Sequence, residues 1–333
     1  MRRVLVVGLG ISGMAVAVRL ADAGWEPVIV ERDTARRTGG YFAGLFTSGK
    51  EAAERLGVLG RMHLRTPDAH RTWALDPAGG RRRSAGFSDQ PGHPESVMRG
   101  DIEAALWERV DGRIEVRFGT TPETVAEDGL VTLHDRVAGR SYEERFDLVV
   151  GADGLRSTVR RLVFGPHRVF LRSMNAIVCA FELDGQVPGF EDGEQLILAE
   201  PGRALWISPF RDRAPTGLFA FRARDVDAQF RGDPLDLLAG DAAWCLTLYS
   251  GMGAGAGMIG AVALGDALTA HPEDLSRALA VYERSMRPLV RGHQALAYLK
   301  AQFFVPSNRV TARIRAWLLG RLTRRLLAAS RVG

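Results

Sequence analysis

The chain has 333 residues, 46% of them hydrophobic, so it can bury a large core and is long enough for two structural domains. Gly, Asp or Arg interrupt each apolar stretch before it reaches transmembrane length. The net charge of +5 comes from scattered arginines rather than from a basic module interleaved with aromatic residues. We therefore expect neither a membrane-spanning protein nor a nucleic-acid-binding one.

Two further features indicate a cytoplasmic protein. Cys179 and Cys245 lie far apart without metal-ligand spacing, and the seven histidines show none either, so we expect no disulfide framework and no metal site. The basic start followed by apolar residues is similar to a secretory signal. However, glycines interrupt the apolar run and Asp22 occupies the would-be cleavage site. We expect no stable membrane association.

The first thirty-one residues have the order strand, glycine turn, helix, strand, acid. Residues 4–7 are typical of a buried parallel strand, residues 14–23 of a helix and residues 27–30 of a second strand. The turn between the first strand and the helix reads Gly8-Leu9-Gly10-Ile11-Ser12-Gly13, and Glu31 follows the second strand. This context predicts a dinucleotide site.

Chemistry explains the spacing of this turn. Gly8 permits the tight turn, Gly10 lets the backbone approach a pyrophosphate, and Gly13 lets the helix pack closely on the strand. The Glu31 carboxylate can accept both hydroxyls of an adenosine ribose, which favours a cofactor with an unphosphorylated ribose, such as FAD or NAD.

Further along, the pattern changes several times. The Gly39-Gly40 pair marks a close backbone approach, residues 49–59 are amphipathic, and residues 65–94 form a hairpin-rich excursion. A helix is expected from Arg99. A strand at residues 114–118, a β-meander and a second buried strand at residues 148–150 should follow.

The second half begins with strands and ends with helices. Residues 163–231 predict one antiparallel sheet, joined by the excursion and covered on one face. Helices are expected at residues 258–268 and at residues 275–300, the latter with Leu279, Tyr282, Met286 and Val290 on one face. Residues 313–329 should form a basic amphipathic helix. A membrane-surface role is one interpretation of it, but we favour a helix packed on the protein with its arginines in water.

Three strand-to-glycine turns carry a family resemblance. They are the turn at residues 8–13, the stretch Gly151-Ala152-Asp153-Gly154, and the stretch Ala239-Gly240-Asp241 that runs on to residues 251–255. In order and approximate spacing they resemble the fingerprint, Asp-Gly motif and Gly-Asp motif of the FAD-dependent aromatic hydroxylases, flavoprotein monooxygenases of the para-hydroxybenzoate hydroxylase type. Arg99, Gly39-Gly40 and residues 282–288 add to the resemblance, which spans nearly the whole chain.

The resemblance implies an α/β fold. A Rossmann-like FAD-binding domain with a parallel sheet and β-meander would comprise residues 1–64, 95–162 and 235–274. It would be interleaved with an antiparallel-sheet substrate domain at residues 65–94 and 163–234, and followed by C-terminal helices at residues 275–333.

The resemblance also assigns roles along the cofactor. Gly8, Gly10, Ser12, Gly13 and Glu31 would hold the ADP half of FAD, with Arg32 along the adenine and Arg99 at the ribityl and phosphate region. Asp153 would orient the middle of the cofactor, and Asp241 would accept hydroxyl hydrogens from the ribityl chain. Gly251, Gly253 and Ala254 would open a helix whose positive end stabilises a reduced flavin.

The chemistry implied by the resemblance centres on the flavin. NADPH or NADH would reduce it transiently, and a C4a-hydroperoxide would then hydroxylate an aromatic or polyketide-like small molecule, so no catalytic acid–base dyad is expected. Aromatic side chains would line the pocket above the flavin, although we expect about half of the strand aromatics to be core instead. The candidates are Phe181, Trp206, Phe210, Phe219, Trp244 and Tyr249.

Two departures from the family pattern leave alternatives open. Residues 244–249 replace the family's histidine and prolines at the flavin edge, and the stretch between Phe221 and Leu235 is a few dozen residues shorter than in the family. A non-redox cyclase, a flavin-holding scaffold, or a flavin reductase or dehydrogenase therefore stays an alternative to hydroxylation. The sequence does not specify an oligomeric state.

Overall fold

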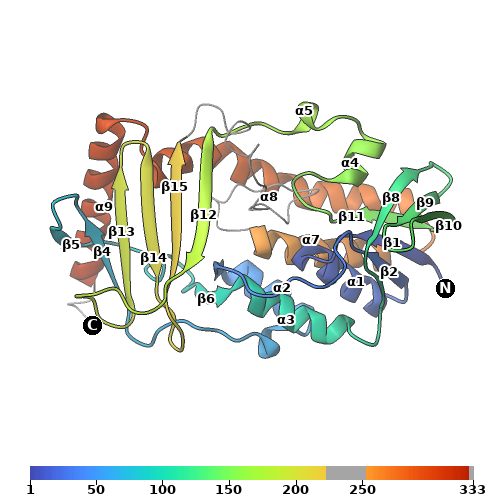
Figure 1. Ribbon diagram of the computed structural model, residues 1–333, viewed down its shortest axis with the longest axis horizontal. Coiled ribbons are helices and arrows are strands. Elements are labelled where there is room, and N and C mark those ends of the chain that lie inside the picture. Colours follow the sequence, from blue (N-terminus) through green and yellow to red (C-terminus); the bar gives the residue numbers. More distant parts are fainter. Residues whose placement is uncertain (223–252, 330–333) are drawn as a thin grey trace.

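The computed structural model describes residues 1–222 and 253–329, which form two halves joined by one long helix. Figure 1 shows a parallel sheet with its helices near the N-terminus and a second, larger sheet near the C-terminus. Helix α8 (Leu275–Phe304) runs behind both halves. The fold is therefore of mixed α/β class, as the sequence predicts.

The parallel sheet is built from the apolar runs of the first half. Strands β1 (Arg3–Val7), β2 (Glu26–Val30), β7 (Glu115–Arg117) and β11 (Leu148–Gly151) pair in the order β11-β1-β2-β7, all in parallel. Strands β1 and β2 are apolar throughout their buried residues because both faces of the sheet are covered.

Helices cover one face of this sheet and the meander covers the other. Val4 and Val6 pack among α1 (Ile11–Asp22), α3 (Arg99–Val110) and α7 (Gly253–Ala270). Leu5 and Val7 contact Val131 and Leu133 of the antiparallel meander, which comprises β8 (Thr120–Val125), β9 (Leu130–Asp135) and β10 (Arg140–Arg145). The predicted Rossmann-like half with its meander is confirmed.

Helix α7 is long and apolar enough to cross a membrane by length and composition alone. Its side chains Met258, Ala261 and Leu264 are instead buried in the main core, alongside those of α1. A helix at the centre of a globular core needs this composition, so burial accounts for its hydropathy.

The second sheet has six strands and includes the excursion, as predicted. Its order is β12-β15-β14-β13-β4-β5. One part of the prediction is wrong, because β4 and β13 pair in parallel rather than antiparallel. These two strands are joined by a long connection through the other half rather than by a hairpin, which permits the parallel orientation. The strands are β4 (Arg71–Leu75), β5 (Arg81–Arg83), β12 (Ala176–Glu182), β13 (Glu194–Glu200), β14 (Arg203–Ser208) and β15 (Thr216–Arg222).

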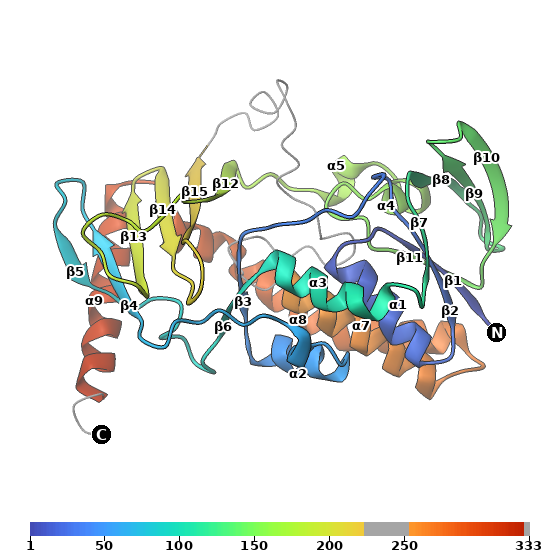
Figure 2. The ribbon, with the colours of Figure 1, turned by 60° about the horizontal axis from the view of Figure 1, so that its bottom comes forward.

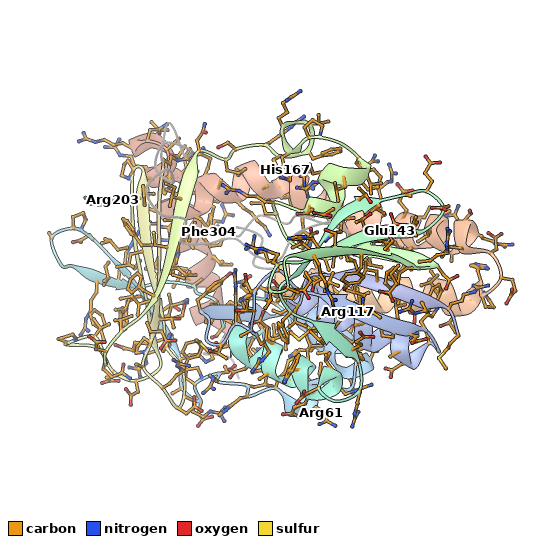
Figure 3. All side chains as sticks on the ribbon, turned by 45° about the vertical axis from the view of Figure 1, so that its right-hand side comes forward. Arg61, Arg117, Glu143, His167, Arg203 and Phe304 are labelled. Atoms are coloured by element: carbon orange, nitrogen blue, oxygen red, sulfur yellow. The ribbon has the colours of Figure 1, made fainter. Side chains whose placement is uncertain are left out.

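The C-terminal helices supply the expected covering layer of this sheet. Ala204 and Ala220 pack with Ala301 and Val305 at the end of α8, and α9 (Arg309–Ala329) follows. Phe304, labelled beside the strands in Figure 3, completes this contact.

Shorter elements complete the fold, and several were not predicted. These are the β3–β6 pair, the turn η1 and the helices α4 and α5. On α8, Met286 and Val290 of the predicted face are buried, whereas Leu279 is 37% exposed and the neighbouring Ala278 is buried. The elements are β3 (Phe42–Leu45), α2 (Thr47–Arg55), η1 (Leu59–Arg61), β6 (Glu95–Met98), α4 (Thr158–Val163) and α5 (His167–Phe170).

Candidate functional site

The glycines of the first turn have different structural roles. Gly8 has φ +108°, and a Cβ built on it would lie 2.6 Å from the Ala152 carbonyl oxygen. A Cβ on Gly13 would lie 1.9 Å from the Gly8 carbonyl oxygen. A Cβ on Gly10, in contrast, would have no heavy atom within 4 Å. Gly8 and Gly13 are therefore required for packing, whereas Gly10 keeps space open in front of the helix.

That open space belongs to a pocket at the carboxyl ends of three parallel strands. β1 leads into Gly8 and Gly10, β2 leads into Glu31, and β11 leads into Asp153, while α3 contributes Arg99. Ligands of open α/β sheets bind at this edge. The structure thus brings together six predicted site residues, namely Gly8, Gly10, Glu31, Arg32, Arg99 and Asp153.

Glu31 is held in place by two backbone amides. Its Oε2 accepts a hydrogen bond of 2.8 Å from the Leu9 amide, and its Oε1 accepts one of 3.0 Å from the Asp33 amide. Each carboxylate oxygen has further lone pairs, so the group can also accept hydrogen bonds from two ligand hydroxyls.

Arg99 is the first residue of α3, and the segment that contains Gly39 and Gly40 passes close to this helix start. Gly40 has φ +152°, and a Cβ on it would lie 2.9 Å from the Gly100 nitrogen, which confirms the close approach predicted for Gly39-Gly40. The Arg99 guanidinium is 2.7 Å from Glu103 Oε1, one helical turn further on. The Glu103 carboxylate therefore orients the Arg99 guanidinium.

Glu103 itself is unusual, because it is a carboxylate that is only 4% exposed. Its Oε2 has no hydrogen-bond partner in the described part of the chain. Burial raises the pKa of Glu103, and the nearby charges of Arg99, Arg36 and Arg37 partly oppose this rise. The carboxylate is thus a buried group with one oxygen unpaired at the wall of the pocket.

Asp153 has its carboxylate engaged by a helix start. Its Oδ2 accepts a hydrogen bond of 2.6 Å from the Thr158 amide, and its Oδ1 accepts one of 2.6 Å from the Ser157 hydroxyl. The side chain therefore fixes the turn before α4. Its predicted role at the middle of the cofactor stays a prediction.

Sequence reasoning missed several residues of the pocket. Arg36, Arg37, Glu103, Arg156 and the start of β8 also line it. Of these, only Glu103 could have been predicted from the sequence, because a residue four positions after Arg99 on a helix lies next to it on the same helix face. The others reach the pocket through tertiary folding that no local pattern encodes.

Ser12 is not among the residues that line the pocket. A Cβ built on Gly257 of α7 would lie 2.4 Å from the Ser12 hydroxyl oxygen, so this side chain lies in the contact between α1 and α7. The role of Ser12 at the ADP half of the cofactor stays a prediction. Gly253 and Ala254 form the start of α7, as expected for the helix that opens there.

The aromatic pocket candidates do not form one group. Trp206 packs on Phe304 of α8 with ring centroids 5.4 Å apart. Phe219 pairs in register with Leu205, the neighbour of Trp206, so it points to the opposite face of the sheet. Trp206 and Phe219 therefore lie on opposite faces of the sheet, and Trp206 is partly buried on the face that α8 covers.

Two more candidates have distinct environments. Phe181 lies on the same face as Phe219 but is 44% exposed. Phe210 is buried 6.0 Å from the ring of Phe42. The predicted residues Asp241, Trp244, Tyr249 and Gly251 lie outside the described residues, and among the described ones no group of three or more potential ligands could hold a metal ion.

Comparison with known proteins identifies the class to which this fold and pocket belong. Residues 1–229 match the family model described as FAD binding domain. The chain therefore belongs to this family of FAD-dependent enzymes, which agrees with the resemblance in the sequence.

Curated relatives include flavin-dependent monooxygenases. The chain is 24% identical to the FAD-dependent monooxygenase asL4 of Sarocladium schorii, over 95% of this chain and 91% of that protein. It is 27% identical to the 2-heptyl-3-hydroxy-4(1H)-quinolone synthase of Mycobacteroides abscessus, over 88% of each. The fold is similar to that of Klebsiella pneumoniae HpxO complexed with FAD and uric acid, with a TM-score of 0.72 and 20% sequence identity. The match covers 97% of this chain and 93% of that chain.

The residues of the pocket fit the ADP half of FAD. The space in front of Gly10 can take a pyrophosphate beside the helix N-terminus and the Arg99 guanidinium. Glu31 offers acceptors for the ribose hydroxyls at the end of β2. The chain is thus an FAD-dependent oxidoreductase of the flavin monooxygenase family.

Proposed function

We propose that this protein is a monooxygenase that hydroxylates an aromatic or polyketide-like small molecule, with NADPH or NADH as the reductant. The observation that carries the proposal is the pocket that joins Gly10, Glu31 and Arg99 at one sheet edge, in a chain whose relatives are named as monooxygenases. Bound FAD would supply the activation of oxygen and the transfer of one oxygen atom to the substrate.

The chain's own residues would bind and orient the cofactor rather than act as acid or base. Glu31 would hold the adenosine ribose, Arg99 would neutralise the pyrophosphate, and Glu103 would keep Arg99 in position. Asp241 would accept hydroxyl hydrogens of the ribityl chain. We expect Asp241→Ala to weaken the retention of FAD.

A substrate would bind against the sheet face that carries Phe219. Phe219 and Phe221 lie 5.6 Å apart on this face, opposite the one that α8 covers. Two neighbouring aromatic rings favour a planar apolar substrate, because offset stacking adds to apolar burial. One relative is named as a quinolone synthase and one similar structure is complexed with uric acid, so the particular substrate is left to experiment.

A second function deserves a test because of the sequence at residues 244–249. That stretch lacks the family's histidine and prolines, so a flavin-binding protein without hydroxylase activity, such as a non-redox cyclase, a scaffold or a reductase, is the alternative.

The test measures nicotinamide oxidation by FAD-loaded protein with NADPH or NADH, with and without candidate phenols or polyketides. Hydroxylation predicts oxidation that the substrate stimulates and that produces a product heavier by one oxygen atom taken from labelled O2. A reductase would turn over equally well without oxygen. Complete absence of nicotinamide oxidation would favour the scaffold or cyclase.

A further inference from the structure

Helix α9 carries an apolar stripe that faces solvent. Its members recur every three or four residues, so they share one side of the helix. Trp317, for example, is 57% exposed and Val310 is 64% exposed. We call this set the α9 stripe, and it consists of Val310, Ile314, Trp317, Leu318 and Leu322.

The packing of α9 fixes the stripe on the outside. Arg315, Leu319 and Thr323 form the buried side, and the Thr323 hydroxyl oxygen accepts a 2.9 Å hydrogen bond from the Ala85 amide. Figure 2 shows α9 at the end of the molecule that lies farthest from the parallel sheet. The helix therefore cannot turn its apolar side inward without breaking these contacts.

Charge is distributed very unevenly along the chain. All 39 acidic residues lie at or before Glu283, whereas 11 of the 44 basic residues follow it. The first 283 residues thus have 33 basic and 39 acidic groups, a formal charge of −6, and the remaining fifty residues carry +11. This terminal region is basic without any acidic residue.

The arginines beside the stripe form no ion pair with any carboxylate that the structure describes. Within residues 1–222 and 253–329, no ion pair involves Arg309, Arg313, Arg321 or Arg324. Arg321 instead lies over the ring of Trp317, 5.7 Å from its centroid. These charges are available to an external anion.

On the buried side of α9, Arg315 likewise forms no ion pair within residues 1–222 and 253–329. Its Nε donates a 2.6 Å hydrogen bond to the Phe303 carbonyl oxygen. Burial and the neighbouring charge of Arg82 lower its pKa to about 10. Within the described residues, the positive charge of these α9 arginines is therefore not paired with carboxylates.

We propose that the α9 stripe docks reversibly on an anionic lipid surface. The apolar side chains would enter the interfacial layer with Trp317 at the headgroup level, and the flanking arginines would pair with lipid phosphates and carboxylates. A second copy of this chain is the less suitable occupant, because apposed α9 helices would bring together two basic regions without an acidic residue to pair with them. The proposal is independent of the proposed enzymatic function, and it replaces our sequence-based preference for a helix whose only role is packing.

The test is co-sedimentation of the full-length protein with vesicles of phosphatidylcholine alone or with about 30% phosphatidylserine, an anionic content at which basic segments bind. We expect binding to the anionic vesicles alone, with weakening as salt rises. The variant Ile314→Ser/Trp317→Ser should lower the partition coefficient at least tenfold, because it removes apolar contact area from the stripe.

A matched control keeps the test specific. Phe164→Ser/Val169→Ser removes two apolar side chains that are 70% and 67% exposed, at least as exposed as Ile314 and Trp317. Because they lie far from α9 in the chain, vesicle binding should be unchanged. Arg313→Gln/Arg324→Gln changes only exposed side chains and should lower binding about tenfold or more, since each arginine contributes about fivefold.

Three results would overturn the proposal. They are equal binding to neutral vesicles, equal loss in the control variant, and no binding by any folded variant. A concentration-dependent dimer that Ile314→Ser/Trp317→Ser dissociates would also overturn it, and would assign the stripe to a second copy of the chain.

Discussion

Replacement of Gly10 by Ala is expected to weaken FAD binding while leaving the stability of the apo protein unchanged. A Cβ on Gly10 has no heavy atom within 4 Å, so the folded chain has room for the methyl group. Its backbone φ of −81° suits any residue. The methyl group would instead occupy space that a pyrophosphate needs, an overpacking that costs about 1–3 kcal/mol, or roughly 5- to 150-fold in affinity.

Gly13→Ala is the matched control, because it perturbs the same turn in the opposite way. Its Cβ would lie 1.9 Å from the Gly8 carbonyl oxygen, where real contacts stay beyond 3.0 Å, so backbone atoms of the turn must separate by at least 1.1 Å. Rigid backbone on both sides makes relief difficult. We expect a loss of about 3 kcal/mol or more in the free energy of unfolding.

Two measurements separate these effects. Urea unfolding of the apo proteins gives stability, and thermal unfolding with added FAD gives the stabilisation that binding produces. Gly10→Ala should keep the wild-type urea midpoint and lose most of the shift caused by FAD, whereas Gly13→Ala should have a lower midpoint. Wild-type FAD affinity in Gly10→Ala, or wild-type stability in Gly13→Ala, would refute this interpretation of the turn.

Three further predictions concern the walls of the pocket. Arg99→Ala should weaken FAD binding and cost about 3 kcal/mol of stability, because it leaves the buried Glu103 carboxylate without its nearest partner. The double variant Arg99→Ala/Glu103→Gln should regain most of the stability but should still bind FAD weakly. Burial raises the pKa of Glu103, so the folded state resists ionisation of this carboxyl group. Between about pH 4 and about pH 8 the wild type therefore loses folding stability, whereas Glu103→Gln has no ionisable group here and does not. The free energy of unfolding of Glu103→Gln, measured with urea, should therefore rise relative to that of the wild type as pH increases. A difference that does not change with pH would contradict the raised pKa. Asp153→Ala should cost about 1 kcal/mol of stability through loss of the hydrogen bonds from the Ser157 hydroxyl and the Thr158 amide, and an unchanged urea midpoint would count against those contacts.

The first turn could be predicted from the sequence because its determinants are local. The spacing of Gly8, Gly10 and Gly13 between an apolar strand and a helix specifies the turn, and Glu31 follows from the next strand. The resemblance of three such turns then predicted their convergence. The pocket confirms this for the turns that end β1 and β11, while the third lies mostly outside the described residues.

The remaining features depend on tertiary contacts that no local pattern reports. Only the pairing register of β14 with β15 places Trp206 and Phe219 on opposite faces, and only the packing of α8 decides which of these faces is covered. The parallel pairing of β4 with β13 joins strands more than a hundred residues apart. The exposure of the α9 stripe likewise depends on which side of α9 packs on its neighbours.

The central claim is that the pocket at the ends of β1, β2 and β11 holds the ADP half of FAD. A crystal structure of the FAD-loaded protein tests it most directly. We expect a pyrophosphate at Gly10 and the Arg99 guanidinium, with the adenosine ribose hydroxyls hydrogen-bonded to Glu31. FAD bound elsewhere, or an ADP half that leaves Glu31 and Arg99 without contact, would contradict it.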